Sequence, residues 1–181
     1  VPRLCYVNKM ARSGAAFLRC VDMIKKRPGA PPLVAPLPIG SEDNFKGMVD
    51  LVENKAYTWD SEDRDAKWEI HELDGNLADK FGITVPSDRA ILDSVSKYRT
   101  ELVDTALEQD DAAMEAYLEG NEPSVETLKK CIRKGTINGA FTVVLCGTAF
   151  KNKGVQQMLD AVADYLPAPT DVEAIATVDQ D

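Results

Sequence analysis

Both ends of the chain predict the same order of elements. Residues 4–7 and 141–146 are short runs of β-branched, aromatic and other apolar side chains, which predict strands buried on both faces. A polar loop follows each run, and apolar residues at helical spacing come next, over 15–27 and 155–166. Each end therefore predicts a strand, a loop and a helix of an α/β domain.

The middle of the chain has a different pattern. Short runs separated by turn-rich segments predict a small antiparallel sheet, with strands at 33–39, 47–52, 56–59 and 67–70. A long helical pattern then covers 88–118, with a break near Asp110, and a second helix covers 124–134 and ends at Gly135. We expect this middle part to be an α+β insertion within the α/β domain.

Composition excludes several classes of protein. The 30 acidic and 21 basic residues give a net charge of −9, which argues against a direct nucleic-acid reader. Four scattered cysteines and one histidine, without a CxxC pair, argue against a zinc site and a disulfide framework, and are typical of reduced thiols in a cytoplasmic protein. No run approaches the ~20 apolar residues that span a bilayer, so we expect no membrane partner.

Two loops follow the predicted parallel strands and hold the candidate chemistry. Ligands of open parallel sheets bind at the carboxyl ends of the strands, where both loops are expected. The first loop reads Asn-Lys-Met-Ala at residues 8–11, and the second begins Gly-Thr-Ala-Phe at residues 147–150. The first resembles the NKxD guanine-specificity motif of GTPases, and the second resembles their other guanine loop.

Longer stretches support the same resemblance. Residues 37–47, 117–120, 132–136, 146–156 and 160–167 resemble, in this order, the elongation factor G family of translational GTPases. The resemblance covers nearly all of residues 1–173 and is weakest across 60–89. It implies an α/β fold, a partial P-loop GTPase (Rossmann-like) domain with an inserted α+β subdomain.

The resemblance also implies a division of the chain. We expect residues 1–30 and 140–167 to form the C-terminal half of the GTPase domain, 31–139 the inserted subdomain, and 168–181 a linker towards a following domain. Because the first strand begins almost at residue 1, we expect the chain to be a piece of a longer protein. Its first strand is then expected to have an unpaired edge that is prone to association.

The resemblance assigns a guanine-binding role to both loops. Asn8 supplies an amide, Lys9 an aliphatic stem against the ring and the Ala149 N–H a bond to O6, and Thr148 and Phe150 complete the expected GTP or GDP site. Position 11 of the same site is Ala11, where the family motif has a carboxylate. Charge-assisted bonds contribute roughly 1.5–3 kcal/mol each, so this change predicts weak nucleotide binding and poor guanine discrimination.

The parts that handle phosphate are absent from the sequence. No GxxxxGK[ST] loop occurs, so the chain has no phosphate loop of this kind. The letters DxxG at residues 79–82 fall within the insertion, and we interpret them as a coincidence. We therefore expect no catalytic residue, no metal site and no GTP hydrolysis by this segment alone, with the Mg²⁺ site elsewhere in the parent protein.

Three further features have structural interpretations. The acidic residues at 60–65 predict a solvated hairpin loop, with Trp59 and Trp68 as cross-strand partners. His71 is interpreted as a surface or packing residue. Three charged residues of the long helix predict a solvated face: Lys97, Arg99 and Glu101.

The family resemblance implies a function in translation. The parent protein is expected to promote translocation of tRNA and mRNA on the ribosome, and the inserted subdomain to contact the C-terminal domain of the ribosomal stalk protein. Two alternatives remain open. In the first, the chain is a protein-interaction module with vestigial nucleotide loops. In the second, it is part of a paralogue with altered base specificity.

Overall fold

The computed structural model describes residues 1–11 and 16–171. Its strands are β1 (Leu4–Val7), β2 (Pro32–Val34), β3 (Pro36–Ile39), β4 (Gly47–Asp50), β5 (Lys55–Trp59), β6 (Trp68–Glu72) and β7 (Thr142–Cys146). Its α-helices are α1 (Phe17–Lys25), α2 (Leu77–Lys80), α3 (Pro86–Asp93), α4 (Val95–Leu107), α5 (Asp111–Leu118), α6 (Val125–Asn138) and α7 (Val155–Tyr165). The described residues also form three short 3₁₀ turns, η1 (Glu42–Asn44), η2 (Ala149–Lys151) and η3 (Pro169–Asp171).

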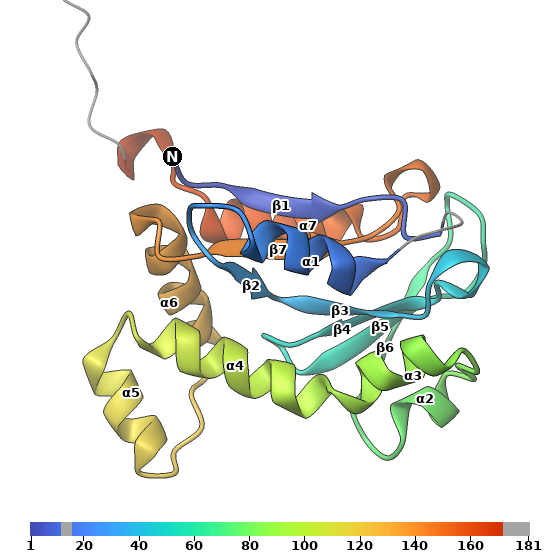
Figure 1. The fold of residues 1–181 in the computed structure, drawn as a ribbon, viewed down its shortest axis with the longest axis horizontal. Helices are drawn as coiled ribbons and strands as arrows, with labels where there is room; N and C mark the ends of the chain where they lie inside the picture. The colour runs from blue at the N-terminus through green and yellow to red at the C-terminus, as the bar shows by residue number, and fades with distance from the viewer. Residues whose placement is uncertain (12–15, 172–181) are drawn as a thin grey trace, which may run out of the picture.

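The first and last strands pair in parallel, as the sequence predicts. Val7 of β1 lies opposite Cys146 of β7, so the two strands end at the same edge. The order of this three-stranded sheet is β1-β7-β2, and helices α1 and α7 lie beside it (Figure 1). The mixed α/β architecture is therefore confirmed, and within the described residues β1 has a neighbour on one side only.

A second, antiparallel sheet has the order β3-β4-β5-β6. The sequence pattern predicts residues 33–39 as one strand of this sheet, and that prediction is wrong. The run divides at Ala35, whose N–H donates to Val144 of β7 at 3.3 Å and whose carbonyl accepts from Leu51 at 2.9 Å. Pro36 follows and has no N–H to continue the first ladder. As a result β2 joins the parallel sheet and β3 the antiparallel one.

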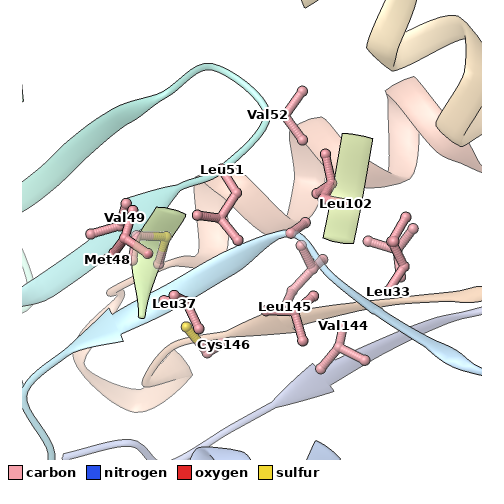
Figure 2. Packing of buried hydrophobic residues seen from close by; sticks show 14 of the residues in the cluster. Leu33, Leu37, Met48, Val49, Leu51, Val52, Leu102, Val144, Leu145 and Cys146 are labelled. Atoms are coloured by element: carbon pink, nitrogen blue, oxygen red, sulfur yellow. The ribbon is translucent and has the colours of Figure 1, made fainter. Parts of the chain in front are cut away.

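One hydrophobic core joins the two sheets. Leu37 of β3 and Cys146 of β7 are both almost fully buried and lie close together in Figure 2. The same cluster of buried residues includes Leu102 of α4. Because β2 lies within residues 31–139 and pairs with β7, the insertion and the α/β part share strands and core, and the boundary between them stays a prediction.

The structure confirms one predicted break between helices, adds a second break and moves the end of α6. The break at Asp110 is confirmed, and the Asp110 side chain caps α5 by accepting from Ala113. A second break at Ser94, which the sequence analysis does not predict, divides the long pattern into α3 and α4. Helix α6 does not end at Gly135 but continues to Asn138, with Gly139 in the left-handed conformation as its cap. Gly135 is an interior position at which a Cβ would lie 2.2 Å from the Phe141 ring.

The structure also decides two further predictions, one about Arg99 and one about the two tryptophans. Arg99 is not part of a solvated face, because its guanidinium donates to the carbonyl oxygens of Leu51 and Val52. Trp59 and Trp68 are cross-strand partners, as predicted.

Most of the predicted linker at 168–181, and residues 12–15 of the first loop, lie outside the described residues. In the described part of the chain, no helix is both long and apolar enough to cross a membrane.

Candidate nucleotide-base site

The parallel register of β1 and β7 brings the two predicted guanine loops side by side. Two backbone hydrogen bonds join them directly after the strands. Gly147 N–H donates to the Val7 carbonyl at 3.0 Å, and Met10 N–H donates to the Gly147 carbonyl at 3.0 Å. The loops are therefore held together by the backbone before any side chain contributes.

Asn8 connects the two loops through its side chain. Its Oδ1 atom accepts from the Lys9 N–H at 2.8 Å and from the Ala149 N–H at 3.0 Å. The sequence analysis assigns this Ala149 N–H to the O6 atom of guanine, whereas here it donates to Asn8. Both bonds use Oδ1, so the Nδ2 group is the part of this amide that remains as a donor for a ligand.

Lys9 and Ala11 of the first loop lie in contrasting environments. Lys9 is exposed and has a φ of 61°, in the left-handed region, which is uncommon for a residue with a side chain. Ala11 is half-buried, and its N–H donates to the Thr148 hydroxyl at 2.9 Å. Thr148 is itself buried, so it joins the loops and does not face solvent. No carboxylate stands at position 11.

Phe150 is the exposed aromatic residue of the second loop. Its side chain is 78% exposed, although large apolar side chains are usually covered. The guanidinium carbon of Arg64 lies 5.2 Å from the ring centroid, a cation–π distance. The sequence analysis does not connect Arg64 with this site, because the two residues belong to segments that are far apart in the chain.

The second loop folds back onto itself over residues 148–153. Thr148 and Lys153 exchange backbone hydrogen bonds of 2.8 and 3.0 Å, and the Tyr6 hydroxyl of β1 donates to the Lys153 carbonyl at 3.2 Å. A side chain at position 147 would collide with that same hydroxyl, since an ideal Cβ there would lie 2.3 Å from it. Gly147 therefore permits the close approach of β1 to the loop.

The acidic hairpin loop between β5 and β6 also contacts the second loop. Glu62 Oε2 lies 2.6 Å from Lys151 Nζ and 3.6 Å from Lys153 Nζ. The hydrogen bond from Lys151 is the main reason that the pKa of Glu62 is lowered. The interpretation of residues 60–65 as a purely solvated loop therefore misses Glu62, and the local sequence carries no signal for a partner 89 residues away.

Other potentially reactive groups of the described residues have structural surroundings. They contain no group of three His, Cys, Asp or Glu side chains that could hold a metal ion. Burial raises the pKa of the Cys146 thiol to about 12, so this cysteine is a packing residue. Asp79, the aspartate of the DxxG sequence at residues 79–82, lies in α2, and its carboxylate is 2.8 Å from the Arg89 guanidinium group.

Comparisons with known proteins indicate the family of the chain. No protein-family model matches the chain. The chain is 51% identical over 179 residues to elongation factor G of Wolbachia pipientis subsp. Culex pipiens (strain wPip), and 50% identical over 179 residues to elongation factor G of Orientia tsutsugamushi (strain Ikeda). These alignments cover 99% of this chain, and 24% and 23% of the relatives.

A solved structure shows the same fold. The crystal structure of a protein from Thermus thermophilus superposes with a TM-score of 0.70 at 24% sequence identity, covering 94% of this chain and 23% of that chain. At this identity the likeness concerns the fold alone. The sequence matches identify the chain as homologous, over nearly all of its length, to a segment of elongation factor G that makes up about a quarter of that protein.

Proposed function

We propose that this chain supplies the guanine-recognition half of the nucleotide site of a translational GTPase. The observation that carries the proposal is the hydrogen bond from the Ala149 N–H to Asn8 Oδ1, which joins the two loops at the carboxyl ends of β1 and β7. An open parallel sheet binds ligands at this edge. The Nδ2 group of Asn8, the Lys9 stem and the exposed Phe150 ring are suited to the edge and faces of a purine.

The ligand is GTP or GDP in the parent protein, and it binds this segment weakly. Ala11 supplies no carboxylate for the N1 and N2 hydrogens of guanine. The sequence has no GxxxxGK[ST] loop, so the phosphates and the Mg²⁺ ion depend on other parts of the parent. The segment by itself therefore does not hydrolyse GTP.

The parent protein acts on the ribosome, where elongation factor G uses GTP to promote translocation of tRNA and mRNA. Within this chain, the proposed ribosomal contact is the exposed acidic surface at the C-terminal end of α4, formed by Glu101 and Asp104 of the helix and by its cap residue Glu108. These residues follow helical spacing, so their charges point to one side. An acidic surface of this kind is suited to a basic partner surface, and the partner we propose is the C-terminal domain of the stalk protein. The proposed location is the cytoplasm.

The main alternative is a protein-interaction module whose nucleotide loops are vestigial, which Ala11 favours. Calorimetric titrations with GDP and with the stalk protein's C-terminal domain distinguish the two. Binding of GDP supports base recognition. Binding of the stalk domain without any GDP binding supports the alternative and contradicts the proposal. A paralogue with altered base specificity would instead bind another nucleoside diphosphate more tightly than GDP.

A further inference from the structure

The hairpin loop between β5 and β6 contacts three residues of the second guanine loop. Glu62 pairs with Lys151 and Lys153, and Arg64 lies over the Phe150 ring. These contacts join segments that are nearly ninety residues apart. The hairpin belongs to the part of the chain that the sequence assigns to the insertion, whereas the guanine loop belongs to the α/β part.

The hairpin loop is itself closed by hydrogen bonds. The Asp60 N–H donates to the Lys67 carbonyl at 3.0 Å, and Asp60 Oδ1 accepts from the Lys67 N–H at 3.0 Å. The loop therefore leaves the β5–β6 ladder with a defined geometry. Glu62 therefore lies in a hairpin whose base is closed, within reach of both lysines.

The contact provides a partner for the buried ammonium group of Lys153. This side chain is only 2% exposed, and a buried ammonium group requires a partner of opposite charge or hydrogen-bond acceptors. Glu62 supplies a carboxylate oxygen 3.6 Å away, and the same oxygen binds Lys151 at 2.6 Å. The single carboxylate of Glu62, whose side chain is 64% exposed, thus pairs with two cations at the base of the loop.

The two lysines are connected to the base-contacting atoms by short backbone links. The Lys151 N–H donates to the Thr148 carbonyl at 3.1 Å, and the Asn152 N–H donates to the Ala149 carbonyl at 2.9 Å. These bonds close the turn η2. Restraining the side chains of Lys151 and Lys153 therefore restrains the turn that carries the Ala149 N–H and the exposed Phe150 ring.

We propose that Glu62 and Arg64 are positioning residues for guanine recognition. Glu62 fixes the turn η2 through its ion pairs with Lys151 and Lys153, and Arg64 fixes the orientation of the Phe150 ring. This inference rests on the proposed function of the two loops. It adds that base recognition depends on a hairpin outside them, in the antiparallel sheet.

The test uses the variant Glu62→Gln, with Asp65→Asn as a matched control from the same hairpin loop. Amide hydrogen exchange is measured first on the nucleotide-free chain. Glu62→Gln is expected to accelerate exchange at Ala149, Lys151 and Asn152, whereas Asp65→Asn leaves these rates unchanged. Unchanged rates at all three amides in Glu62→Gln would overturn the inference, whatever the chain does with nucleotide.

GDP titration followed by the NMR shifts of the same amides is the second readout. Glu62→Gln is expected to weaken GDP binding about three- to fivefold, the range of a partly exposed ion pair. Glu62→Asp keeps the charge and is expected to recover part of the affinity, which a general loosening of the fold would not produce. Equal GDP affinity in Glu62→Gln and wild type would contradict the positioning role.

The two proposals fail in different ways. Absence of GDP-induced shifts in the wild-type chain contradicts the proposed function, and with it the role of Glu62 in base recognition. Normal GDP binding in wild type and unchanged exchange in Glu62→Gln contradict only the inference about the hairpin. Arg64→Gln tests the second contact separately, with an expected loss of GDP affinity and little change at Lys151.

Discussion

The side-chain oxygen of Asn8 accepts the backbone N–H of Ala149 at 3.0 Å, and this bond joins residues that are 141 positions apart in the chain. It forms because β1 and β7 are parallel neighbours that end in register. The loops at residues 8–11 and 147–150, which resemble the two guanine loops of the family, thereby lie side by side. The Ala149 N–H, which the family resemblance assigns to the O6 atom of guanine, donates to Asn8 in this structure.

Two substitutions at Asn8 separate its two roles. Asn8→Ala removes the bond to Ala149 and the Nδ2 donor, whereas Asn8→Asp keeps an acceptor oxygen, removes the donor and adds a negative charge. Hydrogen exchange at Ala149 is expected to accelerate in Asn8→Ala and to stay slow in Asn8→Asp. Both variants are expected to lose GDP affinity by about three- to tenfold, the value of one hydrogen bond. Fast exchange in both would show that Oδ1 does not hold the loop.

Restoring a carboxylate at position 11 is expected to strengthen guanine binding. Ala11→Asp adds an acceptor for the N1 and N2 hydrogens of guanine, and such charge-assisted bonds contribute about 1.5–3 kcal/mol each. GDP affinity should therefore rise by at least tenfold, while ADP affinity should not rise. Ala11→Asn, which is close in size but neutral, is the control. An equal gain for GDP and ADP would argue against base recognition by this loop.

Gly135 tests the packing of α6 on the strand that follows it. In an open helix, alanine is more favourable than glycine by about 1 kcal/mol. Here a Cβ would lie 2.2 Å from the buried Phe141 ring, so Gly135→Ala is expected to lower the free energy of unfolding by about 1–3 kcal/mol. Urea unfolding measures this change. Phe141→Leu should reduce the cost of Gly135→Ala, and strictly additive effects would contradict the assigned clash.

The buried thiol of Cys146 predicts a loss of stability in alkaline solution. Its pKa is raised to about 12, whereas an unfolded cysteine ionises near pH 8.5. Below that pH both states keep the proton and the contribution is fully present. Above it the unfolded chain loses the proton while the folded chain retains it, so the free energy of unfolding falls by up to about 1.4 kcal/mol per pH unit.

Urea unfolding at pH 8 and pH 10 measures this effect. Cys146→Ala is expected to be less stable than wild type at pH 8 but to lose less stability between the two pH values. Cys20→Ala, at a half-buried position of α1, is the control and should lose as much as wild type. An identical pH dependence in Cys146→Ala and wild type would contradict the assignment.

Charge reversal on α4 tests the proposed stalk contact. Glu101 and Glu108 are exposed on the same acidic surface, so Glu101→Lys with Glu108→Lys is expected to weaken binding of the stalk domain by about tenfold at low salt. The difference should shrink as the salt concentration rises. Asp65→Lys, on the β5–β6 hairpin, should have little effect. Surface-immobilised binding kinetics would show the loss mainly in the association rate, and unchanged kinetics would exclude this face.

The parts of the fold that the sequence predicts are those with local patterns. The runs at 4–7 and 141–146 and the break near Asp110 are visible in short segments, and all three are confirmed. The division of residues 33–39 between two sheets is not visible there. It depends on Ala35, which bonds to β7 on one side and to Leu51 on the other.

The candidate site likewise has parts that the sequence predicts and parts that it does not. The two loops can be found from their motifs and from their position after parallel strands. The contacts of Glu62 and Arg64 cannot, because an acidic hairpin in the sequence has the same pattern whether it is solvated or paired with a distant lysine. Gly135 is a similar case, since its role as a contact for Phe141 depends on the tertiary packing of α6.

The most direct test of guanine recognition is an NMR titration of the isotope-labelled chain with GDP and, separately, with ADP. The account predicts weak, saturable shifts from GDP at residues 8–11 and 147–151, with smaller effects elsewhere and no hydrolysis of added GTP. Absence of shifts in both loops at millimolar GDP, or shifts confined to other surfaces, would contradict it.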